Sequence, residues 1–177
     1  DLCGRTVFEG QGYVVCRLDA AQEPALRLWA DGADGQPVRS FDRIRALLEP
    51  GEVLGFAMNA GMYHGDLRAV GLLVIDGEER HPLVTGGGGG NFGLLPNGVF
   101  CTGGVRPFAV VGIRAFDRER PACRLATQSG PMLVIDGELH PRFLPHSDSR
   151  YIRNGVGVDG DGQTAWFAIS DSPVTFH

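Results

Sequence analysis

The sequence predicts an α+β fold of mixed sheets, built mainly from β-hairpins, with few flanking helices around a surface cavity. The 27 glycines and 11 prolines favour many turns and short strands. The hairpin sequence LVIDGE, with Asp-Gly at its turn, occurs twice, at residues 73–78 and 133–138. An apolar content of 43% in 177 residues can bury a core, so we expect one domain over residues 1–177.

The N-terminal half combines short strands with one helix. Runs rich in β-branched and aromatic residues predict strands at residues 12–19, 25–30 and 53–58. A helix is expected over residues 40–49, where Ser40 can cap the N terminus and Pro50-Gly51 ends the helix. The first LVIDGE copy predicts a hairpin over residues 71–79. Five glycines follow at residues 86–90; a surface loop or lid is favoured over a phosphate cradle, because no lysine or helix signal follows them.

The C-terminal half is predicted to be all strands and turns. Strands are expected at residues 98–103, 108–113 and 163–170, and a buried hairpin at 132–138, into which residues 123–128 lead. The two hairpin copies indicate either two related half-sheets or one favourable hairpin that arose twice. The D-G-D-G run at residues 159–162 has the spelling of a calcium loop, but a hairpin turn explains it better.

Charge and composition exclude several classes of function. The net charge of −5 argues against a nucleic-acid partner or an anionic membrane surface. No apolar run reaches the ~20 residues of a membrane span, so no membrane insertion is expected. All 16 basic residues are arginine. Any phosphate or carboxylate clamp must therefore use arginine, and lysine Schiff-base chemistry is excluded.

The four cysteines allow three disulfide pairings. Cys3–Cys16 with Cys101–Cys123 is the sequence-local choice and would imply an oxidising compartment; the alternative is four reduced thiols in the cytosol. No C-x-x-C spacing occurs, and the histidines are scattered, so no metal site and no cofactor are expected.

Four motifs in order carry a family resemblance. They are N-A-G-M-Y at residues 59–63, an N-F and P-N-G-V-F segment within 88–100, Q-S-G-P-M-L-V at 128–134, and R-N-G-V-G at 153–157. Together they resemble the phosphodiester glycosidase family. The resemblance implies a domain whose sheets frame a cavity, and hydrolysis of a sugar-1-phosphodiester to free sugar and phosphomonoester. It also implies a later Leu-Asp-Gly-Gly motif, so we expect that the domain's C-terminal part is lacking here.

The chemistry of this reaction requires an anion clamp, a carboxylate and hydrogen-bond donors that hold the sugar. As catalytic residues we predict Asp171, at a strand end, with Arg153 as the phosphate clamp and Asn59 as a hydrogen-bonding amide. The plainer alternatives are a surface salt bridge for Arg153, a capping or turn amide for Asn59, and a cap of a following helix for Asp171. The predicted substrate-binding residues are Gly61, Tyr63, Gln128, Ser129, Gly130, Arg150 and Asn154.

The sequence therefore predicts a periplasmic or secreted phosphodiester glycosidase whose partner is a small-molecule or glycan phosphodiester. Two alternatives stay open. One is a non-catalytic extracytoplasmic domain that binds glycans or sugar phosphates. The other is a phosphodiesterase that cuts the P–O bond. The oligomeric state is unknown from the sequence.

Overall fold

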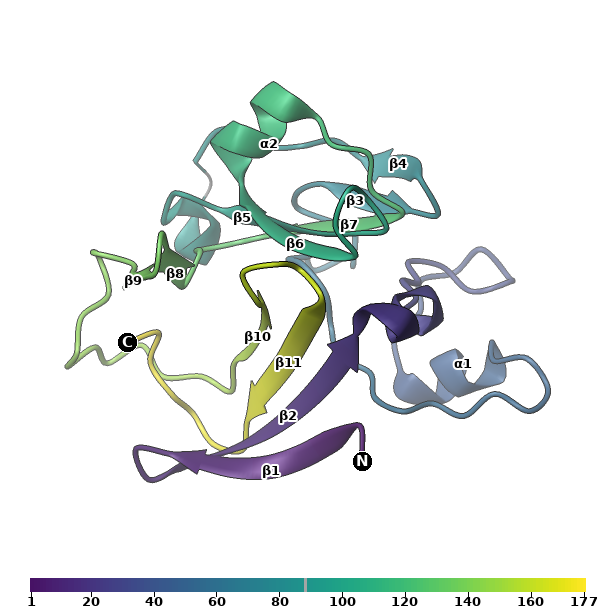
Figure 1. Ribbon diagram of the computed structural model, residues 1–177, viewed down its shortest axis with the longest axis horizontal. Coiled ribbons are helices and arrows are strands. Elements are labelled where there is room, and N and C mark those ends of the chain that lie inside the picture. The colour runs from purple at the N-terminus through teal and green to yellow at the C-terminus, as the bar shows by residue number, and fades with distance from the viewer. Residues whose placement is uncertain (88) are drawn as a thin grey trace.

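A computed structural model describes residues 1–87 and 89–177. It consists of two main antiparallel sheets stacked as layers, with helix α2 (Ile113–Glu119) on the outer face of one sheet (Figure 1). Residue 88, within the predicted five-glycine loop, lies outside the described residues. In the part that the structure describes, none of the helices has the length and apolar character needed to cross a membrane. The predicted sheet-dominated α+β class is confirmed.

The first sheet has four strands in the order β1-β2-β11-β10. The strands are β1 (Cys3–Phe8), β2 (Gln11–Asp19), β10 (Asn154–Val158) and β11 (Thr164–Ser170). Strands β1 and β2 form a hairpin whose turn residues, Glu9 and Gly10, have φ of 48° and 76°. Positive φ at both positions matches the right-handed twist of the two strands.

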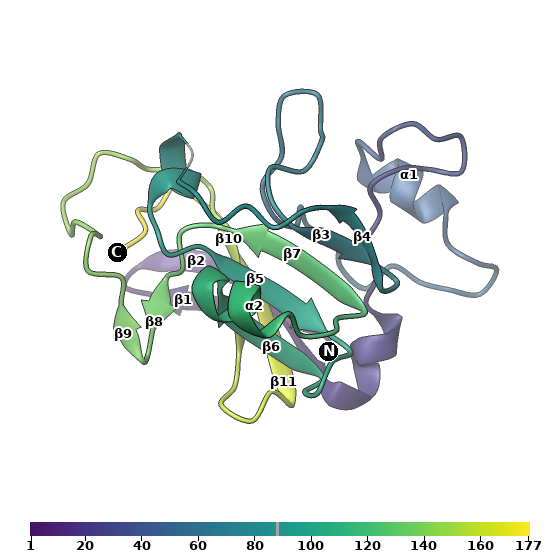
Figure 2. The same ribbon diagram turned by 90° about the horizontal axis from the view of Figure 1, so that it is seen from above.

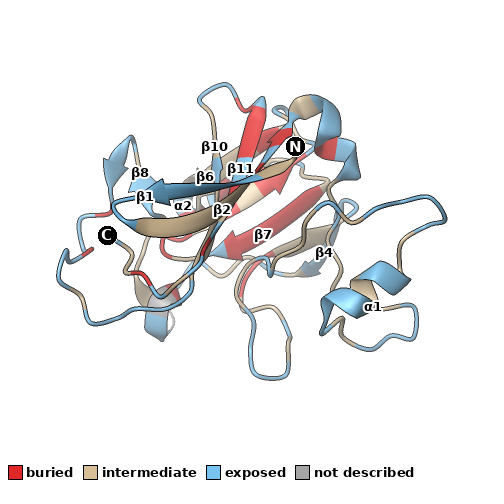
Figure 3. Ribbon diagram, turned by 90° about the horizontal axis from the view of Figure 1, so that it is seen from below, coloured by how far each residue is buried: buried red, intermediate tan, exposed pale blue. Residues whose placement is uncertain are grey.

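The second sheet has five strands in the order β4-β3-β7-β5-β6. The strands are β3 (Leu73–Ile75), β4 (Glu78–His81), β5 (Gly98–Thr102), β6 (Phe108–Gly112) and β7 (Leu125–Ser129). Strand β7 is the central strand, hydrogen-bonded to β3 on one side and β5 on the other. Its residues Leu125 to Gln128 are all buried, as Figure 3 shows for β7.

Strand β5 contributes side chains to two hydrophobic cores, one on each face of the sheet. Val99 and Cys101 point to the side of α2, where they pack with Ile113 and Phe116 of that helix. Phe100 points to the other side and packs against the core of the four-stranded sheet. This alternation follows from the period of two along a strand. Figure 2 shows α2 lying over β5 and β6. The helix therefore covers the core that contains Val99 and Cys101, on the face of the sheet away from the four-stranded sheet.

Several predicted elements are confirmed. Ser40 caps helix α1 (Phe41–Ala46) by accepting a 3.3 Å hydrogen bond from Arg43 N. The strands predicted near residues 12–19, 98–103, 108–113 and 163–170 correspond to β2, β5, β6 and β11. Strand β7 lies where the sequence predicts no strand. The D-G-D-G run forms the turn between β10 and β11, as the hairpin interpretation predicts.

The two LVIDGE copies both fold as hairpins, but in different settings. The first forms β3 and β4 within the five-stranded sheet, whereas the second forms an isolated pair, β8 (Val134–Ile135) and β9 (Glu138–Leu139). Val134 and Leu139 are 51% and 54% exposed, so the prediction of a buried second hairpin is wrong. The two copies are therefore not two related half-sheets.

Two predicted strands are wrong. Residues 25–30 begin at the last residue of a 3₁₀ segment (Ala20–Ala25) and form no strand, and residues 53–58 form none either. Phe56 and Met58 nevertheless pack against the core of the four-stranded sheet. Their apolar character is explained by this packing and not by a strand. The sequence did not predict β1, β10 or α2.

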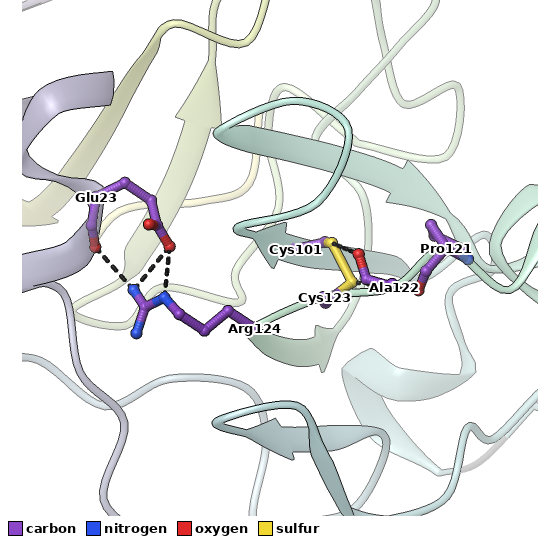
Figure 4. Close-up of a disulfide and its surroundings, with 6 residues drawn as sticks. All are labelled: Glu23, Cys101, Pro121, Ala122, Cys123 and Arg124. Atoms are coloured by element: carbon purple, nitrogen blue, oxygen red, sulfur yellow. Dashed lines mark hydrogen bonds and ion pairs between the residues drawn. A yellow bond between two sulfur atoms is a disulfide. The ribbon is translucent and has the colours of Figure 1, made fainter.

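Both disulfides of the sequence-local pairing are present. Cys3–Cys16 joins directly opposed residues of β1 and β2, and Cys101–Cys123 joins β5 to the segment before β7. Arg124, next to the second disulfide, donates hydrogen bonds to the carboxylate of Glu23 (Figure 4). Glu23 lies just before the segment that lines the cleft from residue 25 onward. Arg124 also donates to the backbone oxygens of Glu23 and Leu26, so it fixes this segment to the start of β7.

Candidate functional site

A cleft of about 2620 Å³ lies between the two sheets. One wall comes from the five-stranded sheet, through Phe100 and Val110, and the other from the four-stranded sheet, through Val156 and Phe167. The loop at residues 52–63 also lines the cleft. Ordinary ligand pockets enclose about 300–1,000 Å³, so a small ligand would occupy only part of this space. The polar residues that line the cleft therefore indicate which part of it binds a ligand.

Asn59 and Asn154 form the polar pair of the cleft. Asn154, the first residue of β10, donates from Nδ2 to Asn59 Oδ1 at 2.8 Å and to Asn59 O at 3.1 Å. Among the described residues, no partner is found for Asn59 Nδ2 or for Asn154 Oδ1. The pair therefore presents a donor and an acceptor side by side, which suits a hydroxyl-rich ligand such as a sugar.

Gly61 and Tyr63 follow Asn59 in the same loop and also line the cleft. Gly61 has φ of 64°, and a Cβ there would lie 3.0 Å from Gln128 O, so this position favours glycine. Tyr63 is exposed, and its backbone forms an isolated bridge with Ala69 that closes the loop. The phenol ring is accessible to a ligand in the cleft.

Ser129 and Gly130 reach the cleft from the end of β7. Ser129 is exposed, so its hydroxyl is accessible. A Cβ on Gly130 would lie 1.8 Å from the Oδ1 of Asn97, a fully buried amide. Only glycine leaves room for this contact.

Gln128 lies behind the site and not in it. Its side chain is 1% exposed, and Oε1 accepts from Leu72 N and Val84 N, both at 3.0 Å. Nε2 donates to Val84 O at 2.7 Å. The carboxamide is thus engaged by backbone groups, and this placement differs from the substrate contact expected from the sequence.

The two predicted arginines lie outside the cleft lining. Arg153 donates from Nε to Val174 O at 3.1 Å and from Nη2 to Ser149 O at 3.1 Å, and its guanidinium stacks on Phe176 at 3.6 Å. Burial lowers the pKa of Arg153 from its ordinary value. No carboxylate pairs with it among the described residues. Arg150 is exposed.

Asp171 also lies away from the cleft. It directly follows β11 as predicted, but its carboxylate pairs with Arg5 of β1 at 2.7 Å and is 36% exposed. Its Oδ2 would lie 2.7 Å from a Cβ on Gly12. The structure therefore joins Asn59, Gly61, Tyr63, Ser129, Gly130 and Asn154 around one cleft and leaves the predicted carboxylate on the opposite side of β11, next to β2.

Sequence reasoning missed Asn97. Asn97 belongs to the P-N-G-V-F motif. The position of an asparagine in the sequence does not show whether its amide is buried or lies in an exposed turn. Within the described residues, no group of three or more histidine, cysteine or carboxylate side chains could hold a metal ion.

Two comparisons with known proteins bear on this site. The sequence profile of the family described as "Phosphodiester glycosidase" matches residues 53–177, which contain all the cleft residues named above. An uncharacterized protein of Escherichia coli (strain K12), YigE, is 31% identical over 156 residues. The match covers 88% of this chain and 60% of that relative, so the chain spans less than two thirds of the relative's length.

Proposed function

Since the chain belongs to the phosphodiester glycosidase family, we propose that it hydrolyses a sugar-1-phosphodiester at the bond between the anomeric carbon and the phosphate oxygen. The products are the free sugar and a phosphomonoester. The substrate is a small-molecule or glycan phosphodiester, and the reaction needs no cofactor.

The observation that carries this proposal is the Asn59–Asn154 pair within the cleft. Asn59 Nδ2 would donate to one sugar hydroxyl while Asn154 Oδ1 accepts from another. Ser129 supplies a third polar group and Tyr63 an aromatic surface on the same cleft. Groups fixed in this way hold a sugar while positive charge develops at its anomeric carbon.

Arg153 is the proposed phosphate clamp. Its guanidinium is half-buried, and its acceptors are backbone oxygens and the hydroxyl of Ser149. A phosphate would offer the negative charge that these neutral acceptors lack. Because Arg153 lies outside the cleft lining, a phosphate bound beside the amide pair requires the guanidinium to turn toward the cleft. Arg150 is a second, more exposed cation on the same segment.

The position of the Asp171 carboxylate favours a second candidate function. Asp171 is the proposed nucleophile or general base, yet it is paired with Arg5 and lies away from the amide pair. This pairing favours the alternative of a sugar-phosphate binding domain without catalysis. The two candidates share the amide pair and differ only in their need for Asp171.

Turnover decides between these functions. The full-length protein is incubated with a sugar-1-phosphodiester, and free sugar is measured for wild type, Arg153→Ala and Asp171→Asn. An enzyme releases sugar and loses release in both variants, whereas a binding domain releases none and loses affinity only in Arg153→Ala. Gln163→Glu, at an exposed position in the β10–β11 turn, is the matched control. If heavy-oxygen label from water enters the phosphate and not the sugar, the protein is a phosphodiesterase and the proposal is wrong.

The disulfides bear on the cellular compartment of the protein. Two disulfides join the described cysteines in pairs, and disulfides persist in oxidising compartments. We therefore propose a periplasmic or secreted location, which fractionation of cells expressing the native full-length gene would test.

A further inference from the structure

Gln128 adjoins or contacts three of the segments that bring a polar group to the cleft. Its backbone leads directly into Ser129. Its carbonyl oxygen lies 3.0 Å from the position of a Cβ on Gly61, in the loop that carries Asn59 and Tyr63. Its side chain binds Leu72 and Val84, and Val84 precedes Thr85, which lines the cleft.

The side chain adds to the backbone contacts at the point where the ladder of the sheet ends. The paired residues of β3 and β7 end at Leu73–Thr127, and Gln128 N still donates to Leu72 O at 2.9 Å. Beyond that point the carboxamide binds both the N–H and the C=O of Val84, as a neighbouring strand would. A Cβ on Gly71 would lie 2.5 Å from Gln128 Oε1, so the chain approaches the amide as closely as it can.

The loop at residues 59–63 rests on this arrangement through a second link. Val70 N donates to Met62 O at 2.9 Å, so the loop is tied to the segment that Gln128 holds at Gly71 and Leu72. A displacement of Gly71 would therefore reach Met62 and then Asn59. All these contacts are buried or half-buried, and a buried amide that loses its partners is left with unsatisfied polar groups that destabilise the fold.

We infer that Gln128 is a positioning residue: its buried carboxamide sets the place of the 59–63 loop, and through it the hydrogen bond between Asn59 and Asn154. It contacts no substrate. The consequence for turnover rests on the proposed function, but the effect on the amide pair does not.

The side-chain amide signals of Asn154 in nitrogen-15 NMR spectra of the protein test this inference without any substrate. In Gln128→Ala these signals move, because the Asn59 acceptors shift. Gln128→Glu keeps the acceptor for Leu72 and Val84 N–H but loses the donor to Val84 O, so it produces a smaller displacement. Gln163→Glu changes the same pair of residue types at an exposed position and leaves the Asn154 signals in place.

Gly61→Ala changes the contact between Gly61 and Gln128 O from the side of the loop. This variant tests the inference if Gln128→Ala fails to fold. Its Cβ would press on Gln128 O and must adopt a positive φ, so it also moves the Asn154 signals. Unchanged Asn154 signals in a folded Gln128→Ala or Gly61→Ala protein would overturn the inference. A role in stability alone lowers the melting temperature without moving them.

Kinetics then separate this inference from the proposed function. If wild type releases sugar, Gln128→Ala lowers kcat/KM by about 100-fold, the cost of misplacing a catalytic group by about 1 Å. Wild type without turnover contradicts the proposed function only, since the NMR result stands without it. Full kcat/KM in a variant whose Asn154 signals have moved contradicts the link between the positioning and catalysis.

Discussion

At the scale of single residues, the site depends on one carboxamide pairing across a long stretch of chain. Asn59 and Asn154 are 95 residues apart in sequence, and the two oxygens of Asn59 both accept from Asn154 Nδ2. This contact holds the 59–63 loop against the edge strand β10. It also fixes which amide atoms are left to face a ligand.

Replacing Asn154 by Asp is expected to weaken sugar-phosphate binding. The carboxylate cannot donate to Asn59 and instead repels its two oxygens, so the pair opens. The loss of a hydrogen bond of this kind corresponds to about 1 kcal/mol, or roughly a fivefold rise in Kd by calorimetry. Gln163→Glu should leave Kd unchanged, and an unchanged Kd in Asn154→Asp would remove the amide pair from the binding site.

Replacing Gly130 by Ala is expected to destabilise the protein because of one neighbouring atom, Asn97 Oδ1, at 1.8 Å from the new Cβ. Overpacking of this kind costs about 1–3 kcal/mol of unfolding free energy. Shortening Asn97 to Ala removes that atom, so the double variant should lose less than the sum of the single variants. Gly157→Ala, where nothing lies within 4 Å of the Cβ, is the control for denaturant unfolding. Additive losses would show that Asn97 does not limit position 130.

At the scale of elements, the parts predicted well are those that local chemistry determines. The Asp-Gly turns of both hairpins adopt positive φ, with 52° at Asp76 and at Asp136, and Ser40 caps its helix. Strand β10 was missed because two of its five residues are glycine. Its pairing comes from β11, and no propensity of its own predicts it.

The same limit applies to the site. Six of the ten predicted site residues line the cleft, because those positions lie in the 59–63 loop and at strand ends. Whether a polar side chain faces the cleft or the interior depends on tertiary pairing. Gln128 and Ser129 are neighbours on β7, so their side chains lie on opposite faces, and only the structure shows that Gln128 is the inward one.

The turn between β10 and β11 gives a prediction on pH. Asp159 Oδ1 accepts from Thr164 N at 3.0 Å, and this backbone hydrogen bond holds the pKa of Asp159 below its ordinary value. A carboxyl group with a lowered pKa in the folded state stabilises the protein above its unfolded pKa, and the contribution is lost as pH falls through the folded pKa. Wild type should therefore be more stable than Asp159→Asn at pH 7, and the difference should vanish in acid, below the ordinary range of aspartate. A difference that stays constant between pH 7 and pH 2 would contradict this role; thermal unfolding at both values measures it.

At the scale of the whole molecule, the cleft exists because its two walls are fixed to each other at one side. Phe100 of the five-stranded sheet packs edge-on against Phe167 of the four-stranded sheet, with ring centroids 5.7 Å apart. Phe108 N also donates to Gly162 O, which ties β6 to the β10–β11 turn. These contacts join the layers where β5 and β6 meet β11 and the β10–β11 turn, so the walls keep a defined separation elsewhere.

The ion pair between Glu23 and Arg124 is the second tie, and its removal should destabilise the molecule as a unit. The side chains are 10% and 28% exposed, and Arg124 contacts both the carboxylate and the backbone oxygen of Glu23 (Figure 4). Arg124 also donates to Leu26 O. Arg124→Met leaves Glu23 charged and partly buried without its partner, which costs about 3 kcal/mol where such a pair is buried. Asp42→Ala removes an exposed pair with Arg45 and should cost less than about 1 kcal/mol. Urea unfolding of the two variants compares them. Equal, small losses would mean that the segment after Glu23 is held by apolar packing of Leu26 alone, and that this wall of the cleft does not depend on the ion pair.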